Sequence, residues 1–128
     1  LYRLTSFHVP SLLPSVNKYI IIKMIFHKFG KVFKSKKFEL RLYDDRRKNI
    51  NLGDTIIFHN LNNLDDTISV NVLALLRYPS FADLFADIDY RLCGPANSLE
   101  EKLERVHTFY TTEQEKKFGI LAIKIQLL

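Results

Sequence analysis

Charged and apolar residues alternate in the segment KFELRL (residues 37–42), and this segment is the strongest candidate in the sequence for a binding or catalytic role. Successive side chains of a β-strand point to opposite faces, so Lys37, Glu39 and Arg41 would share one face and three apolar residues the other. Arginine and lysine neutralise phosphates, and arginine can donate two parallel N–H groups to a phosphate or a base edge. The pattern predicts a strand with one core face and one face that either binds a polyanion or is ordinary solvated surface.

Basic residues are concentrated around this segment. Residues 18–48 contain eleven Lys or Arg and three Asp or Glu. Residues 49–128 contain seven Lys or Arg and eleven Asp or Glu. A basic half on an acidic remainder favours a surface for a polyanion such as nucleic acid. A charge run that only keeps the protein dissolved is the alternative interpretation.

The other composition signals exclude several classes of protein. A chain of 128 residues with 47% hydrophobic residues is one globular domain. Cys93 is the single cysteine, and the four histidines are scattered without ligand-type spacing, so we expect no disulfide, no metal and no cofactor. No apolar stretch approaches the roughly 20 residues that a membrane helix needs, and no signal peptide is evident. We therefore expect a cytoplasmic protein without membrane association.

Several strands are predicted from apolar alternation and polar breaks. Three strands joined by polar turns indicate an antiparallel meander or small barrel, and a last, nearly apolar segment indicates a covered strand. Residues 1–17 are expected to be irregular, and residues 18–29 form a strand or a basic amphipathic helix that Gly30 ends. The expected strands are 38–43, 55–60, 67–76 and 120–128.

Three helical segments carry capping signals. Ser80 is expected to cap a helix over residues 81–88. Ser98 and Glu101 are expected to form a capping box at the start of a helix over residues 99–110. A second Ser/Thr-x-x-Glu signal lies at Thr112 and Glu115, and Gly119 ends that turn.

Taken in order, these segments resemble the ASCH domain family, a relative of the PUA-like barrels. The resemblance covers about residues 35–128. It rests on a Lys-x-x-Glu-x-Arg strand, an Asp-x-x-Arg segment, a Gly-Asp turn, a Tyr-x-Ser-Phe helix start and a Tyr…Glu…Gly segment. The matching residues are Lys36, Glu39, Arg41, Asp44, Arg47, Gly53, Asp54, Tyr78, Ser80, Phe81, Tyr110, Glu113 or Glu115, and Gly119.

The resemblance implies an α+β fold with a small mixed or antiparallel PUA-like β-barrel and two or three flanking helices. The domain would span residues 31–128, after an N-terminal segment of residues 1–30 whose structure is left open. The resemblance also implies RNA or nucleotide binding in a basic cleft between the barrel and its helices. The residues expected to bind are Lys36, Lys37, Glu39, Arg41, Arg46, Arg47, Tyr78 and Tyr110.

Two other functions stay open beside RNA binding. One branch of the family resembles amidohydrolases of N4-acetylcytidine, a modified nucleoside, with a lysine, a threonine and a glutamate as catalytic set. Lys36 falls at that lysine, and Glu39 stands where that branch has threonine. An RNA-cleaving enzyme would use Lys36, Glu39 and His107 as the acid and base candidates.

The third class is a protein-interaction module, in which the basic segment binds an acidic protein partner. The oligomeric state is left open.

Overall fold

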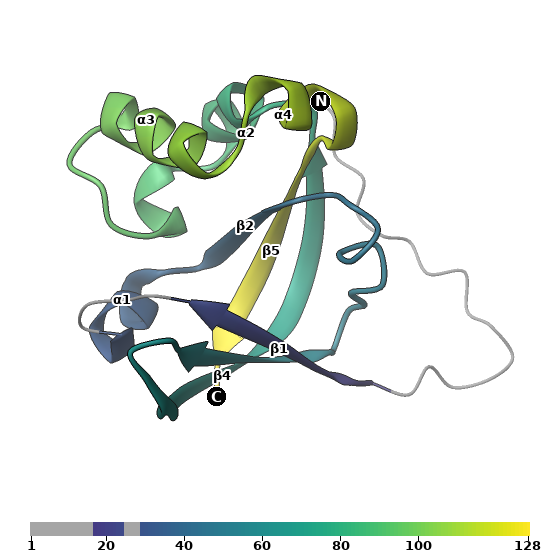
Figure 1. Cartoon of the computed structure of the whole chain (residues 1–128), viewed down its shortest axis with the longest axis vertical. Coiled ribbons are helices and arrows are strands. Elements are labelled where there is room, and N and C mark those ends of the chain that lie inside the picture. The colour runs from purple at the N-terminus through teal and green to yellow at the C-terminus, as the bar shows by residue number, and fades with distance from the viewer. Residues whose placement is uncertain (1–16, 25–28) are drawn as a thin grey trace, which may run out of the picture.

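The computed structural model describes residues 17–24 and 29–128, and its centre is a five-stranded sheet curled into a half-barrel (Figure 1). The strand order is β1-β3-β4-β5-β2, with β1 parallel to β3 and the other neighbouring pairs antiparallel. The expected α+β class with a mixed, barrel-like sheet is therefore confirmed. The strands are β1 Tyr19–Met24, β2 Phe38–Leu42, β3 Thr55–Asn60, β4 Asn63–Tyr78 and β5 Ile120–Leu127.

The helices gather at the two ends of the long strands β4 and β5. Figure 1 shows α2, α3 and α4 together at one end and α1 near the other. None of the helices in the described ranges has the length and apolar character needed to cross a membrane. The helices are α1 Phe29–Ser35, α2 Phe81–Asp87, the 3-10 helix η1 Tyr90–Cys93, α3 Leu99–Phe109 and α4 Thr112–Phe118.

Two apolar clusters pack against the sheet. The first cluster combines β3, β4 and β5 with Phe33 of α1 and Ile50 of the β2–β3 loop. The second combines β2, the end of β4 and the start of β5 with α2, η1 and α3, through residues such as Phe81 and Leu84. Burial on this scale is what holds a domain of this size together, at roughly 25 cal/mol per Å² of apolar surface removed from water.

Strand β2 lies at one edge of the sheet and is buried on both faces over much of its length. Phe38 and Leu42 enter the second cluster. Glu39 pairs with Ile123 and Arg41 with Leu121, and both of these β5 residues belong to the first cluster. Because directly opposite residues share a face, Glu39 and Arg41 point to the side of the first cluster rather than to open solvent.

The predicted meander of three consecutive strands is wrong. Only β3 and β4 form a hairpin, while β2 pairs with β5 at the opposite edge of the sheet. Alternation reports which face of a strand is buried, but it says nothing about which strand lies beside it. Strand β4 also begins at Asn63 and ends at Tyr78, because the polar residues expected in the turn already belong to the ladder.

The N-terminal expectations are partly corrected. Residues 19–24 form a strand, β1, which extends the sheet beyond β3. Gly30 lies inside α1 and does not end the preceding element. Residues 1–16, expected to be irregular, lie outside the described residues.

The predicted caps are confirmed at two helices and displaced at the third. Ser80 and Ser98 accept hydrogen bonds from the backbone N–H groups of Asp83 and Glu101. The Glu101 carboxylate, however, accepts from the N–H of Asn97, so the box at α3 is not reciprocal. Helix α4 is capped by Thr111 with Gln114, one residue before the expected pair, which leaves Glu115 available for a buried contact.

The Gly53-Asp54 turn fastens β1 to the rest of the sheet. The Asp54 carboxylate is buried and accepts hydrogen bonds from the backbone N–H groups of Lys18 and Asn51, and it pairs with Lys18 Nζ at 2.7 Å. Burial raises the pKa of Asp54, but the bonds from Lys18 and Asn51 outweigh it, so the pKa lies below its ordinary value. The Gly-Asp pair of the sequence pattern therefore has a structural role here.

Replacing Gly119 by alanine is expected to destabilise the fold. Gly119 has φ 68° and ψ −179°, a region that essentially only glycine occupies, and a Cβ there would lie 3.0 Å from the Tyr78 carbonyl oxygen. We predict a loss of about 1–3 kcal/mol in the free energy of unfolding, measured by urea denaturation. Gly119→Asn should cost as much, because asparagine relieves strain only in the left-handed helical region. A wild-type midpoint for both variants would contradict this reading.

Candidate binding site around strand β2

A buried ion cluster lies at the start of β2. Lys36 Nζ donates to Glu39 Oε2 at 2.7 Å, and Arg41 Nε lies 3.3 Å from Glu39 Oε1. The exposed fractions of the three side chains are 5% for Lys36, 4% for Glu39 and 17% for Arg41. Three of the residues that the sequence selected therefore meet at one place, and they are held inside the protein rather than on a solvated face.

The local chain path explains how these charges become buried. The N–H of Lys36 donates to the carbonyl of Val32 in α1, so the helix leads directly into the cluster. The N–H of Lys37 donates to the carbonyl of Leu92, which brings η1 against the outer edge of β2. The edge strand is thus covered by other elements where Lys36 and Glu39 lie.

Another buried charged side chain, Lys102 of α3, contacts η1 beside this cluster, and sequence reasoning missed it. Lys102 is 7% exposed and its Nζ donates to the carbonyl oxygen of Cys93 at 2.8 Å. Its position three residues after Leu99 and four before Val106 places it on the apolar face of α3. The sequence signal that could have identified Lys102 is a lysine at a position where the helical pattern expects an apolar residue.

The electrostatics of the cluster are dominated by burial and by the cations. Burial raises the pKa of Glu39, but the charges of Lys36, Arg41 and Lys102 outweigh it, and the pKa lies below its ordinary value. Burial lowers the pKa of Lys102, and the neighbouring charge of Lys36 lowers it further. Glu39 is therefore a carboxylate at neutral pH, in contact with the cationic side chains of Lys36 and Arg41.

Cys93 lies beside the cluster but is not a nucleophile. Burial raises the pKa of its thiol to about 12, despite the nearby charges of Lys102 and Lys36. A thiol in this state carries almost no thiolate at neutral pH. Within the described ranges, no group of three His, Cys, Asp or Glu side chains could hold a metal ion.

Arg41 is the least satisfied member of the cluster. Among the described residues, its Nε is the one buried side-chain nitrogen or oxygen without a hydrogen-bond partner. Arg41 also stands opposite Leu121, whose other neighbour across the sheet is Arg77. Two arginines therefore flank β5 on the same face of the sheet.

Arg77 extends the basic face beyond the predicted residues. Its guanidinium carbon lies 3.7 Å from the ring centroid of Tyr43, and Lys48 Nζ lies 5.7 Å from the same centroid. This geometry is a cation–π contact on a half-buried ring. The sequence offered no signal for Arg77, since it lies near the end of a long apolar strand.

The remaining predicted residues lie apart from the cluster. Lys37 and Arg46 are exposed, and Arg47 pairs with Asp44 at 2.8 Å. Tyr78 is buried in the second apolar cluster and its hydroxyl donates to Asp87, so its ring offers no free face to a base. Its predicted role in stacking is corrected to a structural one.

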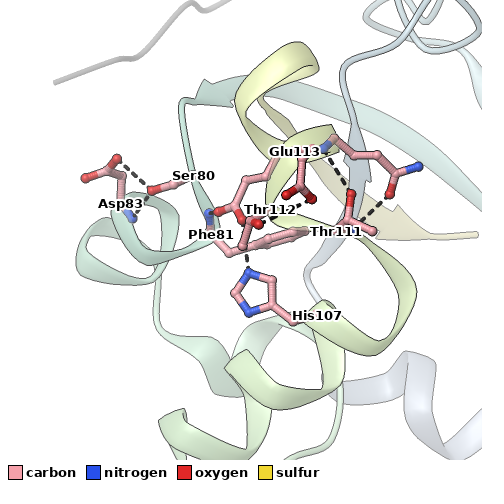
Figure 2. A network of polar contacts seen from close by, with 9 residues as sticks. Ser80, Phe81, Asp83, His107, Thr111, Thr112 and Glu113 are labelled. Atoms are coloured by element: carbon pink, nitrogen blue, oxygen red, sulfur yellow. Dashed lines mark hydrogen bonds and ion pairs between the residues drawn. The ribbon is translucent and has the colours of Figure 1, made fainter.

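His107 belongs to a second polar network, which joins α2, α3 and α4 (Figure 2), and Tyr110 packs beside it. The buried Glu115 carboxylate accepts the backbone N–H of Phe81 at 2.7 Å and lies 3.0 Å from His107 Nε2. Tyr110 stacks on Phe81 with ring centroids 5.8 Å apart. Of the two glutamates in the sequence pattern, Glu115 is the buried one, and its role is to hold the start of α2.

Glu39→Gln is expected to destabilise the protein because it leaves buried cations without a counter-charge. Removing one partner of a buried ion pair costs roughly 3–5 kcal/mol, and we expect a loss of that size in the free energy of unfolding at pH 7. The pKa of Glu39 is lower in the folded state, so its carboxylate stabilises the fold above the unfolded pKa of about 4.3. The difference between wild type and variant should shrink as the pH falls below that value.

Denaturant titrations at several pH values measure this difference. Glu104→Gln on the exposed side of α3 is the control and should change stability by less than about 0.5 kcal/mol. Equal stabilities of wild type and Glu39→Gln at pH 7 would show that the cluster does not depend on this carboxylate.

Two solved structures resemble this one closely. The crystal structure of hypothetical protein PH0355 is 31% identical, with a TM-score of 0.73 over 87% of this chain and 99% of that chain. The solution structure of PF0455 from Pyrococcus furiosus is also 31% identical, with a TM-score of 0.69 over 86% of this chain and 97% of that chain. No family model and no curated protein matches the sequence, so the ASCH resemblance stays a prediction. At this identity and coverage, the chain belongs to the same family as PH0355 and PF0455.

Proposed function

We propose that this protein binds RNA or a nucleotide through the face of the sheet that carries Lys36, Glu39 and Arg41. The observation that supports the proposal most is the imbalance of charge in the buried cluster, where two cationic side chains, Lys36 and Arg41, contact the single carboxylate of Glu39. Such an arrangement attracts an anion and repels a cation. The ASCH resemblance, which rests on the same residues, supports the same function.

Glu39 fits this role as a positioning residue. Its two oxygens contact Lys36 and Arg41 separately, so one carboxylate fixes the direction of two cationic side chains. Charges held in place before binding lose less side-chain entropy when the ligand arrives. The basic residues 46–48 of the β2–β3 loop and Arg77 would add long-range attraction for a polyanion.

A hydrolase that uses Lys36 and Glu39 is the second candidate, because the two groups are in direct contact. An acid and a base must lie within hydrogen-bond reach of one another or of the substrate, and 2.7 Å satisfies this requirement. Two observations make it the weaker candidate. Glu39 is held ionised with a lowered pKa, and His107 pairs with Glu115 instead of facing Glu39.

Arg41→Gln is expected to weaken binding of a fluorescently labelled single-stranded RNA by at least about tenfold. The loss of one positioned phosphate or base contact accounts for a factor of this size. Fluorescence anisotropy at several salt concentrations measures it. For the wild type, the logarithm of the binding constant should fall linearly with the logarithm of the salt concentration, with a slope of several charges.

Lys117→Gln in α4 is the matched control, since it removes one exposed positive charge whose contact is with the ring of Phe118, outside the cluster. It should leave affinity within about twofold of wild type. Absence of RNA binding by the wild type at low salt would overturn the proposal and direct attention to an acidic protein partner. Turnover of RNA or N4-acetylcytidine that Glu39→Gln abolishes would favour the hydrolase instead.

A further inference from the structure

Arg77, near the end of β4, is held against the ring of Tyr43. Its guanidinium carbon lies 3.7 Å from the ring centroid. A guanidinium standing on edge at this distance would bring one of its nitrogens into the ring, so the group must lie nearly parallel to it. Stacking of this kind fixes a long side chain that would otherwise rotate freely. The N–H bonds of Arg77 therefore point sideways, along the plane of the ring, rather than into it.

The guanidinium of Arg77 has no acceptor within the chain. Among the described residues it makes no ion pair and no side-chain hydrogen bond, and its one contact of this kind is with the Tyr43 ring. All Asp and Glu side chains of the sequence belong to residues 39–128, so the undescribed segments contain no carboxylate side chain for it either. The charge of Arg77 is therefore left for a partner outside the chain.

The acidic side chains of β2 and of the β2–β3 loop are paired with other basic residues. These pairs are Glu39 with Lys36 and Arg41, Asp44 with Arg47, Asp45 with Lys48, and Asp54 with Lys18. Arg77 differs from the basic residues of these pairs, because a ring and not a carboxylate holds it in place. An arginine positioned in this way keeps its full charge and all its N–H donors for another anion.

The donors of Arg77 are also open to solvent. Arg77 is half-buried, and the one buried side-chain nitrogen or oxygen without a partner in the described ranges is Nε of Arg41, so the unpaired nitrogens of Arg77 reach water. More positive charge lies nearby. Lys48 Nζ lies 5.7 Å from the centroid of the same Tyr43 ring, and Arg41 lies on the same face of the sheet, across Leu121.

We infer that Arg77, stacked on Tyr43, donates two parallel N–H bonds to a phosphate group of the bound RNA or nucleotide. The inference rests on the proposed function and adds a contact outside the buried cluster. The planar fork of a guanidinium matches two oxygens of a phosphate. Because the ring holds this fork before the ligand arrives, little side-chain entropy is lost on binding. Tyr43 is then a positioning residue for Arg77.

Binding of a labelled single-stranded RNA by conservative variants tests this inference. Arg77→Lys keeps the charge but loses the fork, so affinity should fall by roughly five- to tenfold. Tyr43→Leu should weaken binding to a similar extent, because the guanidinium is no longer held, whereas Tyr43→Phe keeps the ring and should restore binding. Arg105→Lys is the matched control, because this arginine of α3 is exposed and pairs with Glu101. It should bind within about twofold of wild type.

The salt dependence shows whether Arg77 contacts a phosphate or a base. Arg77→Gln should reduce the slope of the logarithm of the binding constant against the logarithm of salt by about 0.7, the value for one phosphate on a single strand. It should also weaken homopolymers of uridine and of adenosine equally. An unchanged slope, or a loss confined to one base, would overturn the phosphate contact.

A purely structural role of the stack would give a different result. If Arg77→Lys and Tyr43→Leu unfold at lower urea concentrations than wild type but bind RNA as tightly, the stack only supports the fold and the inference is wrong. Affinities are therefore measured at a temperature at which the urea curves show every variant to be folded.

The NMR signal of the Arg77 Nε–H group separates this inference from the proposed function. If wild type binds RNA but this signal and the affinities of the variants do not change, the contact is wrong and RNA binding stands. If RNA does not bind but inorganic phosphate shifts the signal in wild type and not in Tyr43→Leu, the contact stands and the ligand is a small phosphorylated molecule. If neither RNA nor phosphate acts on the wild type, both proposals fail.

Discussion

The buried ion pair between Lys36 and Glu39 is the interaction on which the arrangement around β2 depends. A carboxylate that is almost fully buried must be neutralised, and Lys36 does so at 2.7 Å directly after α1. The same carboxylate holds Arg41, and the charge of Lys102 from α3 also favours its ionised form. Elements that are far apart in the chain are therefore linked through one side chain of an edge strand.

The buried charges that suit the cluster to binding also reduce the stability of the unliganded protein. A single ion pair would neutralise the charge of Glu39, and burying the further cations Arg41 and Lys102 adds a desolvation cost. Binding sites commonly retain groups that destabilise the unliganded protein. By contrast, Asp54 is matched to Lys18 and to backbone donors, and Glu115 to Phe81 and His107, as expected of buried carboxylates with a structural role.

Local patterns in the sequence predicted local structure well. Ser80 and Ser98 marked the starts of α2 and α3 because a side-chain oxygen there accepts an otherwise unpaired backbone N–H. Alternation predicted β2 and β3 because burial on one face of a strand has a period of two residues. The same alternation selected Glu39 and Arg41, whereas the ASCH resemblance selected Lys36, and these three side chains meet.

What the sequence could not supply was the pairing of distant segments. The partnership of β2 with β5 depends on the whole sheet, and the edge of β2 is covered by η1, a segment that lies about 50 residues away in the chain. Lys102 is 66 residues from Lys36 in the chain, so no local spacing could relate them. Tyr78 carried a binding-site pattern, but its ring is needed in the core between the sheet and α2.

The most direct test of the central claim is a heteronuclear NMR titration of the wild-type protein with a short single-stranded RNA. Binding at the buried charges should give the largest shifts at the amides of residues 36–41 together with Cys93, Gly94 and Lys102, since these groups lie in or beside the cluster. The amides of α4, including Lys117, should change little. Shifts confined to the exposed loop around Arg46, with the cluster unchanged, would contradict the claim that the buried charges form the site.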